Sequence, residues 1–246
     1  MFRVKVAVVL TGASHTWALP FPLDLDLTLG LLERGPSDPT IRFDRGEVWR
    51  AARTPEGAAS LRLRVHGARL SADAWGPGAG WMIEHTPALV GFDDQPEAFR
   101  PSHRLLTELH RHHPGLRLGR TGLVFEALLP TILEQKVPSV EAYASYARLV
   151  RELGETAPGD TGLLLSPKPA EILATPYWAV HRFGVERRRF AVIQTAAAQA
   201  RRLEALTNIE PATARSLLTT LPGIGPWSAA EVSAVAFGDR DVVSIG

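Results

Sequence analysis

Two glycines one residue apart stand near the C-terminal end of the chain, at Gly223 and Gly225, and Pro226 follows them directly. A glycine has no Cβ atom, so this segment can turn sharply and bring its backbone N–H groups against a bulky anion. Proline suits the first position of a helix, where its missing N–H costs nothing. The glycine amides and the positive end of the next helix then point the same way. The chemistry predicted for Gly223, Ile224, Gly225 and Pro226 is the binding of a phosphate group.

Helical patterns are expected on both sides of these glycines. The upstream helix begins at Pro211 and places four apolar residues on one face, Ala214, Leu217, Leu218 and Leu221. A dinucleotide-binding loop would need a strand at this place, so the glycine spacing alone does not indicate one. The segment is predicted to form a helix, a tight hairpin and a second helix. Two alternatives stay open: a turn that binds no ligand, and a phosphate site for a nucleotide metabolite.

Two further polar segments have side chains that could reach an anion. The strongest helical pattern ends at Gln135 and Lys136, and its apolar residues are Phe125, Leu128, Leu129, Ile132 and Leu133. A cationic run at 181–189 includes Arg187 and Arg188 and begins a long helix expected at about 185–206. Each phosphate that such a cation neutralises releases counterions and adds affinity. An ordinary solvated surface is the alternative for both segments.

Composition excludes several kinds of chemistry. The chain has no cysteine, which removes disulfides, thiol nucleophiles and iron–sulfur ligation. His110, His112 and His113 have no acidic or cysteine partner at ligand spacing, so we expect surface histidines and no metal site. The net charge is only +1, so any binding to nucleic acid must depend on where the charges lie.

The chain divides into a part rich in strands and a part rich in helices. Its 246 residues, 45% of them hydrophobic, suffice for two small domains. Leu23, Leu25, Leu27 and Leu29 alternate with polar or small residues, as do Leu61, Leu63 and Val65, and both patterns predict strands. Residues 1–95 are therefore expected to form a small β-rich domain. Residues 100–246 are expected to form a mainly α-helical domain, which makes the fold class α+β.

Three shorter helices complete this expectation. Leu105, Leu106 and Leu109 mark the first, and residues 171–174 mark another. Ser139 is predicted to cap a helix whose inner face carries Val140, Tyr143, Ala147 and Val150.

The apolar run at 6–10 is too short to span a bilayer or to serve as a signal peptide. We expect a cytoplasmic monomer that has no membrane partner.

The string LPGIGPWSAAEVSAVAFG at 221–238 resembles the hairpin of the helix-hairpin-helix (HhH-GPD) DNA glycosylases, and in particular the 3-methyladenine DNA glycosylase II branch. The resemblance covers 121–246 and extends more loosely to the N-terminus. It implies a sheet-containing N-terminal domain followed by a helical domain. It also implies base-excision repair of duplex DNA, in which a damaged base is turned out of the stack and its N-glycosidic bond is hydrolysed.

The resemblance also implies roles for individual residues. The hairpin from Gly223 to Pro226 would hold the DNA backbone, together with a monovalent cation in the DNA complex and no other cofactor. Gln135 and Lys136 would occupy the gap left by the extruded base. Independently of the resemblance, the cationic run predicts that Arg187 and Arg188 contact phosphates. Trp227 and Glu231 would line the base pocket, where an aromatic face favours a positively charged alkylated base. A core tryptophan and a solvent-facing glutamate are the alternatives.

Two departures from the family pattern bear on catalysis. Trp227 stands where bifunctional members carry a nucleophilic lysine, so a monofunctional enzyme is expected. The family's catalytic aspartate lies about twenty residues further on, just beyond Gly246, and Asp239 and Asp241 come too early to replace it. We therefore expect a C-terminally incomplete domain that lacks the catalytic carboxylate and excises no base. The alternative function is a non-catalytic helix-hairpin-helix DNA-binding protein.

Overall fold

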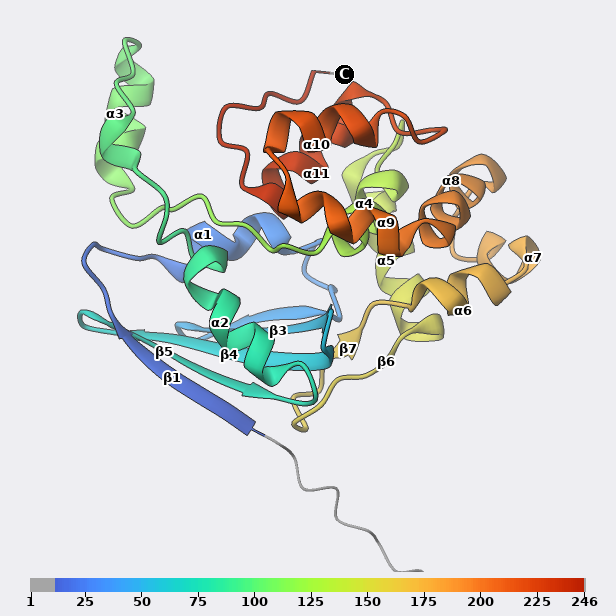
Figure 1. The fold of residues 1–246 in the computed structure, drawn as a ribbon, viewed down its shortest axis with the longest axis horizontal. Coiled ribbons are helices and arrows are strands. Elements are labelled where there is room, and N and C mark those ends of the chain that lie inside the picture. The colour runs from blue at the N-terminus through green and yellow to red at the C-terminus, as the bar shows by residue number, and fades with distance from the viewer. Residues whose placement is uncertain (1–11, 246) are drawn as a thin grey trace, which may run out of the picture.

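A computed structural model describes residues 12–245 and shows an α+β fold, as predicted (Figure 1). Five antiparallel strands form one sheet in the order β1-β5-β4-β3-β2. In chain order the strands are β1 Gly12–Ala18, β2 Ile41–Asp44, β3 Glu47–Thr54, β4 Gly57–His66 and β5 Arg69–Trp75. The apolar run at 6–10 lies outside the described residues. No helix within 12–245 is long and apolar enough to cross a membrane.

One of the two predicted leucine strands is a helix. Leu61 and Leu63 are buried in strand β4, as expected, but Leu25–Leu29 forms helix α1. The Asp24 side chain accepts a hydrogen bond from the Leu27 N–H at 3.0 Å, which caps the first turn of this helix. Leu25 and Leu29, four residues apart, then face the core, while Leu27 is exposed. A local cap and helical burial therefore prevail over the alternating pattern.

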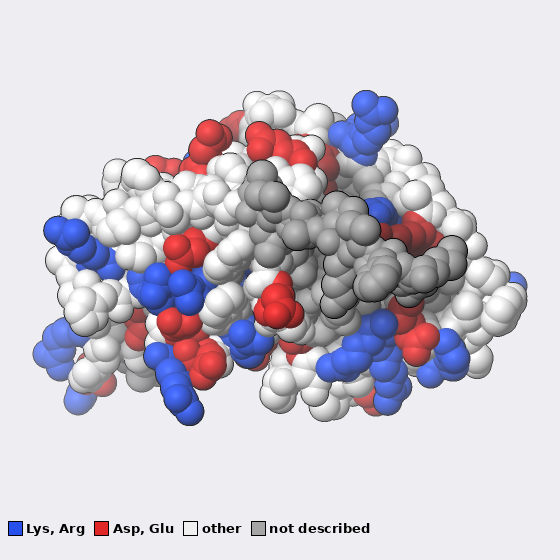
Figure 2. Space-filling view, turned by 90° about the horizontal axis from the view of Figure 1, so that it is seen from below, with Lys and Arg blue, Asp and Glu red and all other residues white. Residues whose placement is uncertain are grey.

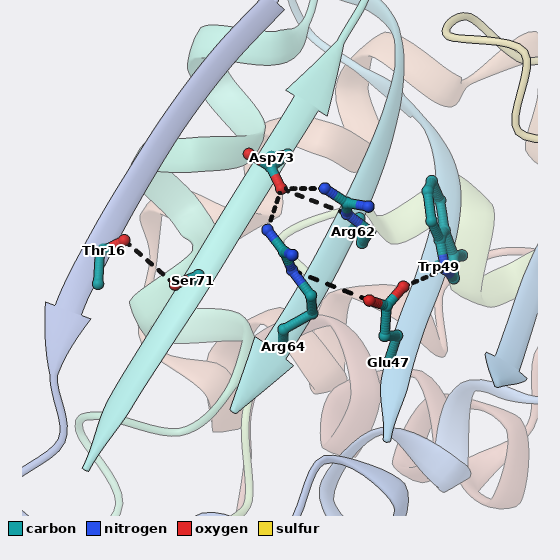
Figure 3. Close-up of polar contacts among 7 residues, drawn as sticks. All are labelled: Thr16, Glu47, Trp49, Arg62, Arg64, Ser71 and Asp73. Carbon is teal, nitrogen blue, oxygen red and sulfur yellow. Dashed lines mark hydrogen bonds and ion pairs between the residues drawn. The ribbon is translucent and has the colours of Figure 1, made fainter. Parts of the chain in front are cut away.

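The two faces of the sheet have different partners. Helix α2, Ala79–Leu89, packs on the face that carries Leu61 and Leu63. The other face carries a polar network in which Arg62 and Arg64 both donate to the Asp73 carboxylate, at 2.8 and 2.9 Å (Figure 3).

Figure 2 views the molecule from below, and in its described part basic and acidic side chains alternate without a continuous basic patch. This view therefore gives no reason to place a polyanion there.

The second half of the chain is helical. Its helices are α3 Arg104–His112, α4 Val124–Leu133, α5 Ser139–Leu153, α6 Pro169–Ala174, α7 Tyr177–His181, α8 Arg187–Ala198, α9 Ala200–Glu204, α10 Pro211–Leu218 and α11 Pro226–Val232. Short 3₁₀ segments occur at Gly30–Leu32, Pro96–Ala98 and Ala205–Asn208, and a π-helical turn, Ser233–Phe237, follows α11. Two short strands, β6 Glu155–Thr156 and β7 Leu164–Leu165, form a separate ribbon.

Three details of the predicted helices are wrong. The long helix expected at 185–206 is divided at Gln199, which ends α8 and precedes α9. Ser139 is the first residue of α5 and not its cap, which is Pro138. The buried face of α5 carries Ala142, Tyr146 and Leu149 in addition to Ala147 and Val150, while Val140 is exposed. The apolar stripe was thus predicted partly out of register around the helix.

Helix α4 lies at the centre of the helical core. Nine of its ten residues are buried, and it packs against α5, α8, α9 and α11. Its first turn is closed by Glu204, whose carboxylate accepts the N–H groups of Val124 and Phe125 at 2.8 Å each. Burial raises the pKa of Glu204, and the two backbone hydrogen bonds offset this only in part. The helix that ends at Gln135 is therefore fixed at its start by a residue eighty positions away.

An ion pair joins the sheet to this central helix. Arg50 of β3 pairs with Glu126 of α4, and both side chains are largely withdrawn from water. Burial raises the pKa of Glu126, and the Arg50 guanidinium opposes that shift.

The division of the chain into domains at residues 95–100 stays a prediction.

Candidate functional site

The predicted helix-hairpin-helix is present, with α10 leading into a turn at 219–225 and α11 leaving it. Gly223 has φ +88°, and a Cβ atom there would lie 2.3 Å from Cγ2 of Val192 in α8. Glycine is therefore required at Gly223 both by backbone conformation and by space. Gly225 is extended and precedes α11, and a Cβ there would meet nothing within 4 Å. Ile224 points inward and is 4% exposed, so it fixes the turn to the core.

The backbone amides of the turn are available to a ligand. Gly223 is exposed, and Gly225 is partly exposed. Within residues 12–245, the N–H groups of Gly223, Gly225, Trp227 and Ser228 donate to no other group. Trp227 and Ser228 lie in the first turn of α11, and Ser228 is buried, so the N–H groups of Gly223 and Gly225 are the donors in the exposed turn that suit the oxygens of an anion.

Gln135 lies against the hairpin and does not project freely. Its side-chain Nε2 donates to the Gly223 carbonyl oxygen and to the Ser228 Oγ, both at 2.9 Å. The end of α4 is thereby attached to both sides of the turn. The predicted placement of Gln135 in a vacated base stack would require these two hydrogen bonds to break.

Lys136, the next residue, projects from the surface. It is exposed and adopts a left-handed conformation with φ +57°, just after α4 ends. Such a conformation is uncommon for a residue with a side chain and reverses the chain direction sharply. Lys136 is thus placed beside the hairpin through its neighbour Gln135, with its side chain in solvent.

The three arginines at the start of α8 have three different environments. Arg187 lies over the Tyr177 ring, with 4.9 Å between its guanidinium carbon and the ring centroid. Arg189 is buried and donates to the Leu133 carbonyl oxygen at 2.8 Å, which ties α8 to α4. Arg188 is exposed and lies one helical turn before Val192, the residue that touches Gly223. Of the predicted pair, Arg188 shares the face of α8 that meets the hairpin.

Trp227 and Glu231 are one turn apart on α11, and both are partly exposed. Trp227 is thus neither a fully buried core residue nor a free surface side chain. The charge of Glu231 raises the pKa of the carboxyl of Glu134, the residue that follows α4. Their role in holding a base stays a prediction.

Glu134 and Arg34 are residues that sequence reasoning missed. Arg34 reaches the end of α4 from the segment that follows α1, and its Nε lies 3.7 Å from Glu134 Oε1. Both side chains are about 15% exposed, and neither of these two atoms has a hydrogen-bond partner within the described chain. Burial raises the pKa of Glu134, Arg34 opposes the shift, and Glu231 adds to it. Glu134 directly precedes Gln135, and this adjacency was the available sequence signal.

Asp239 has a structural role. It pairs with Arg215 of α10 and accepts a hydrogen bond from the Ser233 hydroxyl at 2.8 Å. These contacts join the residues after α11 back to α10. Asp241 is exposed.

The three histidines lie at the end of α3. The ring of His110 packs edge-on against Phe99, with ring centroids 5.6 Å apart. Within residues 12–245, no group of three or more histidine, cysteine or acidic side chains is arranged to bind a metal ion.

Comparisons with known proteins bear on the fold. No family model matches this chain, and no curated protein matches it by sequence. Among solved structures, a 3-methyladenine DNA glycosylase from Archaeoglobus fulgidus is similar, with TM-score 0.75 and 22% identity over 91% of this chain and 80% of that one. MBOgg1 in complex with a low affinity DNA ligand has TM-score 0.74 and 16% identity over 96% of this chain and 82% of that one.

The apo form of an 8-oxoguanine glycosylase/lyase from Clostridium acetobutylicum is also similar. Its TM-score is 0.68 at 10% identity, over 96% of this chain and 83% of that one. The likeness in each case extends over the sheet as well as the helices, because it covers more than nine-tenths of this chain. The chain therefore has the fold of the helix-hairpin-helix DNA glycosylases, which confirms the fold that the sequence resemblance predicts.

Proposed function

We propose that this chain is a monofunctional DNA glycosylase that removes alkylated bases of the 3-methyladenine kind from duplex DNA. The observation that carries the proposal is the exposed hairpin at 219–225, in which the N–H groups of Gly223 and Gly225 are unpaired within the described chain, in a fold shared with DNA glycosylases. Unpaired amides at a glycine turn fit a phosphate without reading its sequence. The partner is double-stranded DNA that contains a damaged base.

The proposed DNA contact extends from the hairpin to two cations. Lys136 is adjacent to Gln135, which bonds to the Gly223 carbonyl, and Arg188 is one turn from Val192, which touches Gly223. Two positive side chains beside one amide cluster suit neighbouring phosphates of one strand. Lys136 would also enter the gap left by the extruded nucleotide, because it is exposed and directly follows Gln135, which bonds to the hairpin.

The proposed reaction is hydrolysis of the bond between the sugar C1′ and the base nitrogen. The electron pair of that bond leaves with the base, and water adds to the positively charged sugar and loses a proton. Trp227 has no amine to form a Schiff base with the sugar, so water is the nucleophile. A base that already carries positive charge leaves more readily, and the face of Trp227 would stabilise it.

A monovalent cation at the hairpin belongs to the same proposal. The carbonyl oxygens of Pro222 and Ile224 accept no hydrogen bond from other described residues, whereas the Gly223 carbonyl is bonded to Gln135. Neutral oxygens of this kind suit a hard cation. When bound, the ion would add positive charge next to a phosphate. Replacing potassium with tetramethylammonium at constant ionic strength should weaken DNA binding if the ion is present.

The function is tested with duplexes that carry one 3-methyladenine, 7-methylguanine or hypoxanthine. Alkali converts any abasic product to a strand break, and borohydride traps any Schiff base. Strand breaks after alkali and no trapped complex are expected from a protein that includes the catalytic aspartate expected just beyond Gly246, whereas residues 1–246 alone are expected to bind the duplex and excise no base. A trapped complex would refute monofunctional chemistry.

A second candidate function is DNA binding without catalysis, which the same hairpin supports. It predicts retention of the duplex containing an abasic-site analogue, together with intact bases in the release assay. Failure to retain any duplex would exclude both functions and leave the nucleotide-metabolite alternative. That alternative requires saturable nucleotide binding that duplex DNA does not displace.

A further inference from the structure

Helix α7 and the start of α8 form a corner at the outer edge of the helical half, residues 177–188, here called the α7–α8 corner (Figure 1). Its most exposed side chain is Trp178, which is 77% exposed. Within residues 12–245, no other aromatic ring and no guanidinium group stacks on Trp178. A large aromatic side chain in water gains free energy when a flat partner covers it. Trp178 therefore presents an aromatic surface that a ligand can use.

Three arginines of the corner accompany this tryptophan. Arg182 comes one helical turn after Trp178, on the same face. Its ion pair with Glu152, at 3.0 Å, has both side chains more than half exposed. Such a surface pair contributes little to stability, so the Arg182 guanidinium can bind a phosphate instead. Arg187 and Arg188 are exposed at the start of α8.

The charges of the corner favour an anionic partner. Three arginines stand against one acidic side chain of the same segment, Glu186, which gives residues 177–188 a net charge of +2. Tryptophan and arginine are also common at the centres of protein interfaces. The excess of positive charge favours a polyanion over a neutral protein surface.

The corner is attached to the part of the molecule that carries the hairpin. Arg189 is buried and donates to two backbone carbonyl oxygens, that of Leu133 at the end of α4 at 2.8 Å and that of Gly184 in the corner at 3.4 Å. Further along α8, Val192 lies against Gly223 of the hairpin. Since the corner begins one helical turn before Val192, a DNA strand that leaves the hairpin along α8 meets the corner next.

Cations beside an exposed aromatic ring suit single-stranded DNA better than duplex. The cations hold the phosphates, and the ring stacks on a base. In a continuous duplex each base is already stacked on its neighbours, so its face is not available to Trp178. An unpaired base has a free face, and stacking on tryptophan does not depend on which base it is.

Resting on the proposed function, we propose that the α7–α8 corner binds single-stranded DNA adjoining the damaged duplex. One unpaired base stacks on Trp178, while Arg182 and Arg187 hold the phosphates on either side. The chain then binds a lesion next to a single-stranded region more tightly than the same lesion within a continuous duplex.

The test compares three duplexes that carry the same abasic-site analogue near one end. The first is blunt at that end, and the other two carry a tail of about eight thymidines, on the 3′ end or on the 5′ end of the damaged strand. Fluorescence anisotropy measures the affinity of the whole chain for each at one salt concentration. One of the two tails should raise the affinity of the wild type by about tenfold.

Substitutions assign this preference to the corner. Trp178→Ala should remove most of the preference for the tail, and Trp178→Phe should keep part of it, because phenylalanine still stacks on a base. Both variants should bind the blunt duplex like the wild type. Arg182→Gln should lower the slope of log affinity against log salt for the tailed duplex only. Phe99→Ala is the matched control, because Phe99 is also an exposed aromatic residue but follows Pro96–Ala98, and it should keep the full preference.

The outcomes separate this inference from the proposed function. If the wild type retains neither the blunt nor the tailed duplexes, the proposed function fails. If it retains the blunt duplex but gains nothing from either tail, only the inference fails. The inference also fails if Trp178→Ala keeps the preference, or if Trp178→Ala weakens binding to all three duplexes equally. Self-association that Trp178→Ala abolishes, measured by sedimentation and found together with no tail preference, would assign the corner to a protein interface instead.

Discussion

The side-chain Nε2 of Gln135 donates a hydrogen bond of 2.9 Å to the carbonyl oxygen of Gly223, eighty-eight residues further along the chain. The same nitrogen lies 2.9 Å from the Ser228 hydroxyl oxygen. One amide group therefore connects the end of the central helix to both ends of the hairpin. This arrangement orients the unpaired hairpin amides relative to Lys136.

Removing this connection should weaken DNA binding. Gln135→Ala loses both hydrogen bonds, each worth about 1 kcal/mol, so affinity for an abasic-analogue duplex should fall by about tenfold or more. Gln95→Ala, in the loop before Pro96–Ala98, should bind like the wild type. Fluorescence anisotropy measures both. Unchanged affinity in Gln135→Ala would mean that the hairpin keeps its orientation without Gln135.

The two hairpin glycines should respond differently to alanine. Gly223→Ala meets Val192 at 2.3 Å and imposes a left-handed conformation, so the free energy of unfolding should fall by about 1–3 kcal/mol. Gly225→Ala has open space at an ordinary φ and should cost about 1 kcal/mol or less. Urea denaturation gives both values. Equal losses would contradict the packing of Gly223 against α8.

Lys136 and Arg188 should each contribute a phosphate contact. Lys136→Ala and Arg188→Ala should each reduce the slope of log affinity against log salt by about one, whatever the DNA sequence. Arg45→Ala is the matched control, because Arg45 is exposed and left-handed like Lys136 but lies in the turn between β2 and β3. Its slope should equal that of the wild type. A slope change in Arg45→Ala as large as in Lys136→Ala would indicate attraction by overall charge alone.

The cap on α4 gives a dependence of stability on pH. The pKa of Glu204 is raised in the folded protein. At pH values between its unfolded and folded pKa, the native state therefore binds more protons than the unfolded state. Its contribution to stability is greatest below the unfolded pKa, and it declines as pH rises through the higher folded pKa. The unfolding free energy of wild type relative to Glu204→Gln should therefore fall as pH increases above about 4.5. Denaturant titrations at several pH values measure this difference, and a rise with pH would contradict the burial of Glu204.

Local patterns predicted the elements that depend on neighbours in sequence. The apolar spacing at 125–133 and the glycine-proline turn gave α4 and the hairpin, because each is determined by residues within a few positions. Leu25–Leu29 was predicted wrongly, because alternating leucines also fit a short helix once Asp24 caps it. Glu134 was missed because its significance depends on Arg34, a hundred residues away in the sequence. Gln135 was predicted to enter the gap left by an extruded base, and the sequence did not show that its amide bonds to the hairpin, eighty-eight residues further along the chain.

The backbone amides of the hairpin are expected to bind the phosphate backbone of DNA. This binding is tested most directly by following the backbone amide NMR signals of Gly223 and Gly225 while an abasic-analogue duplex is added. Both signals should shift or broaden in proportion to the bound fraction, and the signal of Gly46 in the turn between β2 and β3 should stay in place. Saturable binding of the duplex with both hairpin signals unmoved would contradict it.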